Sequence, residues 1–169
     1  MRAALLIVSI VLFVLQLGCS TFTVAPPDTT ADNLTITAAT GPLAPQAYRA
    51  QLRFAYEPPT KLHAGQTLSL HLLVKNLSDQ IWPSGSEPDG KYQIRIGNRW
   101  RNAEGAVTED GRGSLSYDLR PGDEAEVLIV ITAPKMPGEY ALEFDMVQEQ
   151  VAWFSDKGSE KLRVNMRVE

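Results

Sequence analysis

The residues of this chain that could bind a ligand are tryptophans and the arginines beside them. Trp100 stands between Arg99 and Arg101, and Trp82 lies in a long polar stretch, directly before a proline. A tryptophan ring offers a flat apolar face to a sugar, and an arginine adds directed hydrogen bonds or a charge for an acidic glycan. The candidate ligand-binding residues are therefore Trp82, Arg99, Trp100 and Arg101. The competing interpretation places all the tryptophans in the core.

The carboxylates and histidines do not predict catalysis or a metal centre. Asp145 and Glu149 share one face of an expected strand. Four residues of strand span about 13 Å, which is too far for a paired glycosidase site, so we expect a solvated face. His63 and His71 lack an internal cysteine and the close spacing of a copper site. We expect no catalytic residue, no metal and no cofactor, and hence not an enzyme.

The single cysteine, Cys19, follows an apolar run that begins after Arg2. A charged start and an apolar run of about 15 residues are typical of a signal peptide. Gly18-Cys19-Ser20 is similar to the end of a lipoprotein signal, in which the cysteine is lipidated. Cleavage after Ala25 and an uncleaved anchor are the alternatives. Each places the protein in the cell envelope, outside the cytoplasmic membrane, as a lipid-anchored, secreted or single-pass protein.

Length and charge indicate one domain without a nucleic-acid partner. The chain has 169 residues, a net charge of −4 and no basic tract. Residues 1–19 form the signal peptide or membrane anchor, and residues 20–47, rich in proline and threonine, form a tether. Residues 48–169 form the folded domain.

Alternating apolar residues predict strands throughout this domain. The clearest alternation lies at 67–76, and the stretch 119–154 joins two further strands through Pro137-Gly138. The first of them is apolar on both faces in its second half, which predicts cover on both sides. Strands are expected at 48–56, 67–76, 92–100, 114–119, 125–132, 140–147 and 162–168, with a polar hairpin or excursion at 102–113. This pattern predicts an all-β fold, an antiparallel two-sheet β-sandwich.

Two aromatic positions have structural expectations of their own. Tyr140 follows a Pro-Gly turn, so we expect its ring in the core and its hydroxyl bonded to the turn. Trp153 and Phe154 are adjacent, so in an extended segment they point to opposite faces and one of them is less buried.

A series of short motifs resembles a known bacterial module. They run in the order Val74-Lys75-Asn76-x-Ser78, Trp82-Pro83, Trp100, Leu119-x-Pro121-Gly122, Ala133-Pro134, Pro137-Gly138-x-Tyr140-x-Leu142, Asp145-x-Val147-x-Glu149 and Trp153-Phe154. The series resembles an immunoglobulin-like module of bacterial cell-surface and polysaccharide-related proteins. It is similar, more weakly, to the four-tryptophan domain of autophagy receptors. The resemblance implies an immunoglobulin-like β-sandwich that binds or scaffolds rather than catalyses.

Three functions remain open at this point. The first is an envelope-anchored binding or scaffold module, for a surface glycan or an envelope protein. The second is a structural accessory subunit of an envelope protein complex. The third is an envelope glycan-modifying enzyme. An exposed aromatic platform favours a glycan, whereas a bare strand edge or an apolar patch favours a protein partner.

Overall fold

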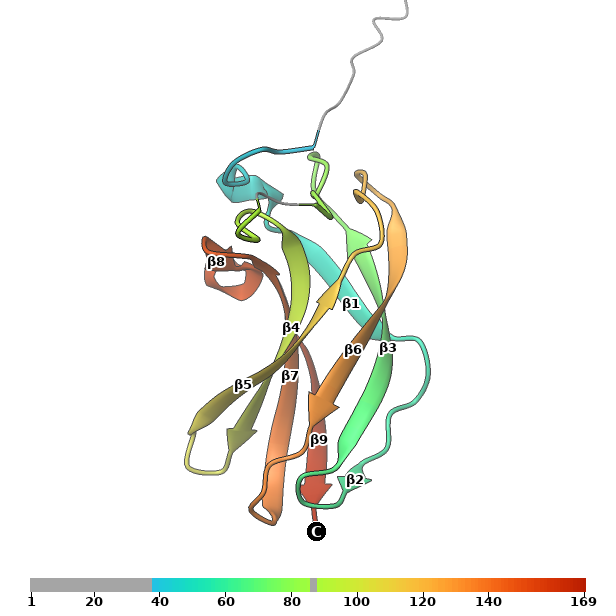
Figure 1. Cartoon of the computed structure of the whole chain (residues 1–169), viewed down its shortest axis with the longest axis vertical. Helices are drawn as coiled ribbons and strands as arrows, with labels where there is room; N and C mark the ends of the chain where they lie inside the picture. The colour runs from blue at the N-terminus through green and yellow to red at the C-terminus, as the bar shows by residue number, and fades with distance from the viewer. Residues whose placement is uncertain (1–37, 86–87) are drawn as a thin grey trace, which may run out of the picture. The chain divides into compact units, whose positions relative to one another are not determined.

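A computed structural model describes residues 38–85 and 88–169, without the side chains at positions 109 and 110. The predicted signal peptide, with Cys19, and most of the predicted tether lie outside the described residues. The described part of the chain forms nine strands and two short 3-10 helices (Figure 1). In chain order these are η1 (Pro45–Ala47), β1 (Ala50–Phe54), β2 (Lys61–Leu62), β3 (Thr67–Asn76), β4 (Ile94–Asn102), β5 (Val107–Ser114), β6 (Glu124–Thr132), β7 (Gly138–Gln148), β8 (Ala152–Trp153), η2 (Phe154–Lys157) and β9 (Leu162–Val168).

The strands form two sheets, as the alternation predicts. A three-stranded sheet has the order β1-β3-β6, and a six-stranded sheet has the order β2-β9-β7-β4-β5, with β8 added on β7. The pairs are antiparallel except β2 with β9, which is parallel. β1 and β2 lie in different sheets, and the connections from β3 to β4 and from β6 to β7 cross from the first sheet to the second. This is the strand order of an immunoglobulin-like sandwich in which β5 has joined the second sheet.

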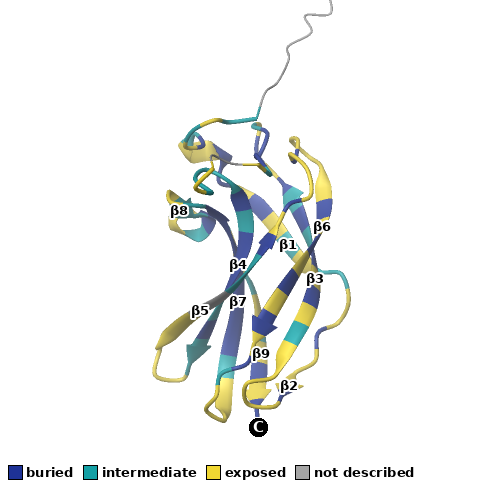
Figure 2. Ribbon diagram, in the orientation of Figure 1, coloured by how far each residue is buried: buried dark blue, intermediate teal, exposed yellow. Residues whose placement is uncertain are grey.

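The core lies between the sheets and follows the strand period. Along β6 every second residue is buried, among them Ile129 and Ile131 at 0% exposure, and β3 alternates in the same way (Figure 2). Leu43 and Ala47, which the sequence analysis placed in the tether, are buried in this core too. The backbone N–H of Leu43 donates to Gln148 Oε1 at 3.0 Å, so the packed domain begins before Tyr48.

The hydroxyl bond expected of Tyr140 and the unequal burial expected of Trp153 and Phe154 are confirmed, whereas the Tyr140 ring is only partly buried against the core. The Tyr140 hydroxyl donates to the Met136 carbonyl at 2.9 Å and so bonds the turn before β7. Phe154 is completely buried, whereas Trp153 is half-buried.

Two expectations about the strands are wrong, and a third is decided between its two alternatives. Leu128 and Val130 are 51% and 47% exposed, because no layer of the described chain covers the outer face of the three-stranded sheet around them. Residues 107–114 form strand β5, which pairs antiparallel with β4, so 102–113 is part of a hairpin and not an excursion. Figure 1 shows β5 running obliquely from beside β4 towards β6. Residues 115–119 form no strand, only an isolated bridge between Leu119 and Trp82.

Candidate functional site

Burial removes both predicted tryptophan platforms. Trp82 is 0% exposed: its indole N–H donates to the Ala47 carbonyl at 3.3 Å, and its ring meets the Phe154 ring edge-on with 5.1 Å between centroids. Trp100 is 2% exposed and packs edge-on against Tyr140. Neither ring can stack on a sugar in this conformation, which corrects the sequence analysis in favour of its core alternative.

Strand parity separates Trp100 from its two arginines. Successive residues of a strand point to opposite faces. On β4 the even-numbered positions are buried in the core, whereas Arg99 and Arg101 stand on the outer face of the six-stranded sheet. Arg101 forms an ion pair with Glu143 at 3.5 Å between Nε and Oε1. The structure therefore brings the arginines to one face and turns the tryptophan to the other.

On this outer face, the arginines meet a different tryptophan. The guanidinium carbon of Arg99 lies 3.7 Å from the ring centroid of Trp153, and that of Arg112 lies 4.7 Å from it. A guanidinium within about 6 Å of a tryptophan face is attracted by the ring quadrupole. Gly97 lies beneath the ring, since a Cβ added there would be 2.6 Å from Trp153 Cη2. The stack fixes Arg99 and Arg112 on the sheet.

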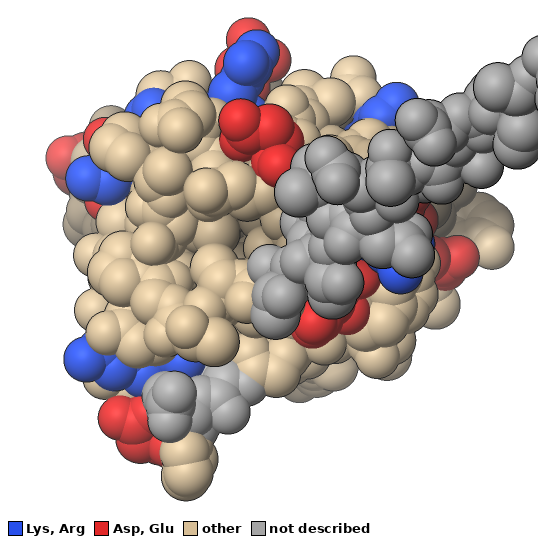
Figure 3. Space-filling model, turned by 90° about the horizontal axis from the view of Figure 1, so that it is seen from above, with Lys and Arg blue, Asp and Glu red and all other residues tan. Residues whose placement is uncertain are grey.

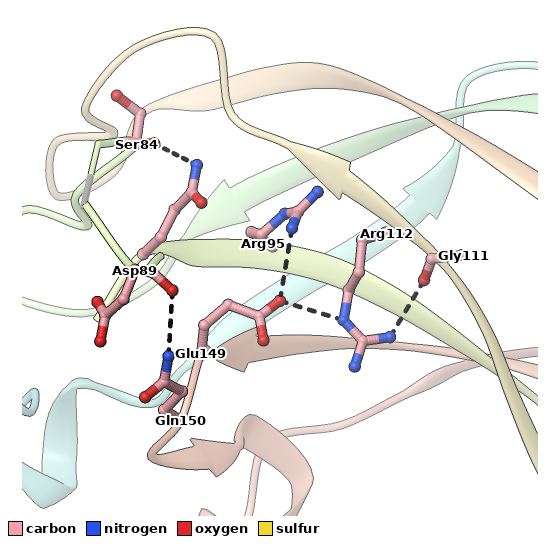
Figure 4. Close-up of polar contacts among 8 residues, drawn as sticks. Ser84, Asp89, Arg95, Gly111, Arg112, Glu149 and Gln150 are labelled. Atoms are coloured by element: carbon pink, nitrogen blue, oxygen red, sulfur yellow. Dashed lines mark hydrogen bonds and ion pairs between the residues drawn. The ribbon is translucent and has the colours of Figure 1, made fainter. Parts of the chain in front are cut away.

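Next to the stack lies a shallow polar depression of about 360 Å³, which we call the arginine hollow. Figure 4 shows how its side chains converge from the start of β4, from β5 and from the turn after β7. Arg112 Nε lies 3.1 Å from Glu149 Oε1, and Gln150 Nε2 donates to the Asp89 carbonyl at 3.2 Å. The arginine hollow is lined by Asp89, Gly90, Gln93, Arg95, Arg112, Glu149 and Gln150.

Arg95 is the least satisfied member of the arginine hollow. Its Nη1 lies 3.9 Å from Glu149 Oε1, beyond hydrogen-bond distance, and its buried Nε has no partner within the described chain. A buried polar group left without a partner costs about 1–3 kcal/mol. Arg95 therefore retains hydrogen-bond donors that no described group accepts.

The backbone around the arginine hollow is held in an uncommon conformation. Within the described residues, Tyr92 at φ 69° and Gln150 at φ 59° are the two non-glycine residues with positive φ. Hydrogen bonds hold the backbone at both positions: Tyr92 N–H donates to the Glu149 carbonyl at 3.1 Å, and Val151 N–H donates to the Gln148 carbonyl at 3.0 Å across Gln150. Strained residues of this kind cluster at ligand sites, where the surrounding structure maintains them.

Two further carboxylates on this face are buried, contrary to the solvated face expected for Asp145. Burial raises the pKa of Glu143, but hydrogen bonds from Lys161 and Arg101 and their charges outweigh it, and the net pKa is lowered. For Asp145, 3% exposed, burial dominates and raises the pKa against a hydrogen bond from Ser155. The segment of β8 and η2 folds over Asp145 and isolates it from solvent.

The charges seen from the end of the sandwich that carries residues 38–48 are mixed. Figure 3 shows acidic and basic side chains in small groups separated by uncharged residues. Among residues 38–85 and 88–169 no group of three His, Cys, Asp or Glu side chains could hold a metal ion. Within the same ranges no helix is long and apolar enough to cross a membrane.

Comparison with known proteins leaves the family open. No protein-family model and no curated protein matches the chain. Among solved structures, a β-glucosidase from Listeria innocua matches with a TM-score of 0.47 and 14% identity over 72% of this chain, which spans 16% of the glucosidase. The CARDB domain of a Pyrococcus furiosus protein matches with a TM-score of 0.42 and 13% identity, over 71% of this chain and 92% of the domain.

A third match is the sporulation control protein of Bacillus subtilis. Its TM-score is 0.41 at 14% identity, over 72% of this chain and 49% of that protein. At these values none of the three assigns a family or a function. The fold class comes from the strand order itself, and the bacterial surface module remains a prediction.

None of the residues that line the arginine hollow was among the ligand-binding residues predicted from the sequence. Parity along β4 could have found Arg95, since it shares the outer face with Arg99. Arg112 lies in the stretch 102–113, which was predicted only as a polar hairpin or excursion because it is polar and glycine-rich. Glu149 joins the arginine hollow through the pairing of β7 with β4, which a single sequence does not reveal.

Proposed function

We propose that the protein is a non-enzymatic binding module of the cell envelope that recognises an acidic surface glycan at the arginine hollow. The observation that supports this most directly is Arg95. Its side chain lines the arginine hollow and is 31% exposed, and its ion pair with Glu149 is long, at 3.9 Å. A sugar carboxylate accepts hydrogen bonds from a guanidinium in a fixed, paired geometry.

The remaining side chains of the arginine hollow suit a sugar better than an apolar ligand. Gln93 and Gln150 use their amide nitrogens in bonds to backbone carbonyls, at 2.6 and 3.2 Å. Their amide oxygens and the carboxylates of Asp89 and Glu149 are acceptors for sugar hydroxyls. Recognition in this proposal rests on hydrogen bonds rather than on ring stacking, because Arg99 and Arg112 lie over the ring of Trp153.

The carboxylates of the same face argue against catalysis. A general acid needs a raised pKa and contact with the substrate. Asp145 has the raised pKa, but it is 3% exposed beneath Ser155. Glu149 faces the arginine hollow, but its Oε1 is engaged by Arg112 Nε at 3.1 Å.

The test is a glycan-array screen of the full chain in detergent, run with two single variants. Arg95→Gln removes the guanidinium from the arginine hollow, and Arg167→Gln makes the same change on exposed β9. We expect signals on uronate-bearing glycans that Arg95→Gln abolishes and Arg167→Gln retains. Equal signals from the wild type and Arg95→Gln, or binding confined to neutral glycans, would refute the proposal.

The envelope location rests on the N-terminal sequence and has its own test. We propose that Cys19 is lipidated and anchors the domain. Replacing Cys19 with Ala should release the protein from the membrane fraction or change its mass. A Cys19→Ala protein that stays in the membrane at wild-type mass and amount would favour an uncleaved anchor instead.

A second candidate function is that of an accessory subunit which docks on an envelope protein. It is favoured by the outer face of the three-stranded sheet, where Leu128 and Val130 are half exposed and Tyr56 is 71% exposed. The Tyr56 ring packs edge-on against His71, which pairs with Leu128 across the sheet. Exposed apolar groups of this kind occur at protein interfaces. Charging this face with Leu128→Glu would then release a partner while leaving glycan binding intact.

A further inference from the structure

The edge strand β1 uses only one of its two hydrogen-bonding sides. It pairs with β3 and with no other strand of the described chain. The ladder includes the bonds from Leu77 N–H to the Arg49 carbonyl and from Ala55 N–H to the His71 carbonyl, both 2.9 Å long. In an antiparallel pair, hydrogen-bonded positions alternate with positions whose backbone groups face the other way. Because residues 49 and 55 bond to β3, the odd-numbered positions of β1 face β3. The even-numbered residues of β1 therefore direct their backbone N–H and C=O groups away from β3.

The first of these outward positions is already capped, and the next two are open. Ala50 N–H donates to Ser159 Oγ at 3.0 Å, and that hydroxyl lies 3.5 Å from the Ala50 carbonyl. Leu52 and Phe54 have no such partner among the described residues. Their two N–H and two C=O groups form the pattern that an added antiparallel strand would bond.

A groove lies beside the start of this edge and reaches Leu52, the first of the two open positions. It encloses about 460 Å³ between the start of β1 and residues 158–162, which lead into β9. Leu52, Leu77 and Leu162 contribute apolar surface to it, and Leu77 is 44% exposed. An added strand would turn alternate side chains inward onto these leucines and the others outward beside Gln51.

The charges at the groove set the polarity of its occupant. Arg49 lines the groove, is exposed and has no ion-pair partner in the described chain. Lys161 lines it too and pairs with Glu143 at 2.8 Å, while Glu160 supplies one negative charge. Opposite charges across neighbouring strands stabilise pairing, and like charges oppose it. Acidic side chains at the outward positions of an added strand would therefore complement the positive charge of the groove.

We propose that this groove is a docking site for an extended segment of a partner protein, which adds to β1 as an antiparallel strand. The segment alternates apolar residues, packed on Leu52 and Leu162, with acidic residues beside Arg49. Indiscriminate pairing is limited because β1 has only five residues and ends before Pro58 and Pro59. The site uses residues separate from the arginine hollow, so it does not depend on glycan binding.

The experiment measures backbone amide exchange by NMR on the full chain in detergent. The probe is a capped peptide of alternating aspartate and valine, and the control peptide has lysine in place of aspartate. With the aspartate peptide, exchange of the Leu52 and Phe54 amides should slow by about tenfold or more. The lysine peptide should leave both amides unchanged.

Two variants separate strand addition from adhesion to side chains. Leu52→Pro removes an outward N–H and leaves the bonds to β3 in place, because proline is tolerated on the open side of an edge strand. Leu52→Val keeps that N–H. We expect Leu52→Pro to lose the protection at Phe54 while its glycan-array signal is unchanged, and Leu52→Val to retain both. Protection that persists in Leu52→Pro, or no protection in the wild type, would overturn the proposal.

Discussion

Adding one methyl group at Gly97 should displace the arginine–tryptophan stack. The new Cβ of Gly97→Ala would lie 2.6 Å from Trp153 Cη2 and 2.9 Å from Arg112 Nη1. Carbon atoms in contact are about 3.5–4.0 Å apart, so the ring must move by about 1 Å. The Trp153 backbone cannot follow easily, because it pairs with Val147 of β7. The ring must rotate away from the guanidinium groups of Arg99 and Arg112.

The magnitude is the difference between two opposing effects. Each cation–π contact of a partly buried ring contributes about 1 kcal/mol, so the loss of both costs about 2 kcal/mol. Replacing glycine by alanine within a strand returns about 0.5–1 kcal/mol. The net destabilisation is about 1–1.5 kcal/mol, which lowers Tm by about 4–6 °C for a domain of this size.

The assay is thermal unfolding together with acrylamide quenching of tryptophan fluorescence. Gly41→Ala is the control, because no atom of the described chain lies within 4 Å of its Cβ position. In a Trp153→Ala background, Gly97→Ala should become neutral or slightly stabilising, since the obstacle is gone. If Gly97→Ala lowers Tm equally in both backgrounds, or leaves quenching unchanged in the wild-type background, the stack does not hold the ring as described.

Three further predictions concern the core and the buried charges. Trp82→Ala should lower the free energy of unfolding, measured with denaturant, by about 3–5 kcal/mol. An unchanged unfolding midpoint would contradict the burial of Trp82. Tyr140→Phe should lower the free energy of unfolding by about 1 kcal/mol through the lost hydrogen bond to Met136, with no change in the far-UV circular dichroism spectrum. A destabilisation larger than that of a core deletion would show that the ring moves too. Glu143→Gln should cost about 1.5–3 kcal/mol at pH 7. The folded pKa of Glu143 lies below its ordinary value of 4.5. The stability difference between the wild type and Glu143→Gln should therefore be largest above pH 4.5 and shrink as the pH falls through the lowered pKa. A stability difference that persists in acid would exclude the pairing with Lys161.

Alternation predicted the central strands because their two faces differ in burial. The exception is the second half of β6, where Leu128 and Val130 are apolar without being covered. An apolar residue on an uncovered sheet face has the same sequence pattern as one beneath a second layer. The number of layers therefore could not be predicted from β6 alone.

The prediction for 102–113 stayed open between a hairpin and an excursion because the glycines of β5 have an unexpected role. Gly111 and Gly113 are residue types that are also common in turns. In the structure, a Cβ at Gly113 would lie 2.7 Å from the Leu128 carbonyl oxygen, and one at Gly111 would fall closer still to that of Val130. The glycines let β5 approach the backbone of β6, which is the other common use of glycine in strands. Because no strand was assigned there, Arg112 was not recognised as a candidate binding residue.

The candidate site was partly predictable. Arg99 and its place on a strand beside Trp100 were recognised, but the alternation that turns the two side chains apart was not applied. The partner tryptophan, Trp153, reaches Arg99 only because β8 folds back onto β7. Such a return depends on tertiary pairing, and no local pattern within the sequence encodes it.

Isothermal titration of an oligogalacturonate tests the central claim most directly. Its matched ligand control is the methyl ester, which keeps the sugar and removes the charge. The wild-type chain and Arg167→Gln should bind the acid and not the ester. Arg95→Gln should lose about 10-fold to 100-fold in affinity, as expected for a charge-assisted hydrogen bond of about 1.5–3 kcal/mol. Equal affinity of Arg95→Gln and the wild type for the acid, or equal affinity of the wild type for acid and ester, would contradict an acidic-glycan site at the arginine hollow.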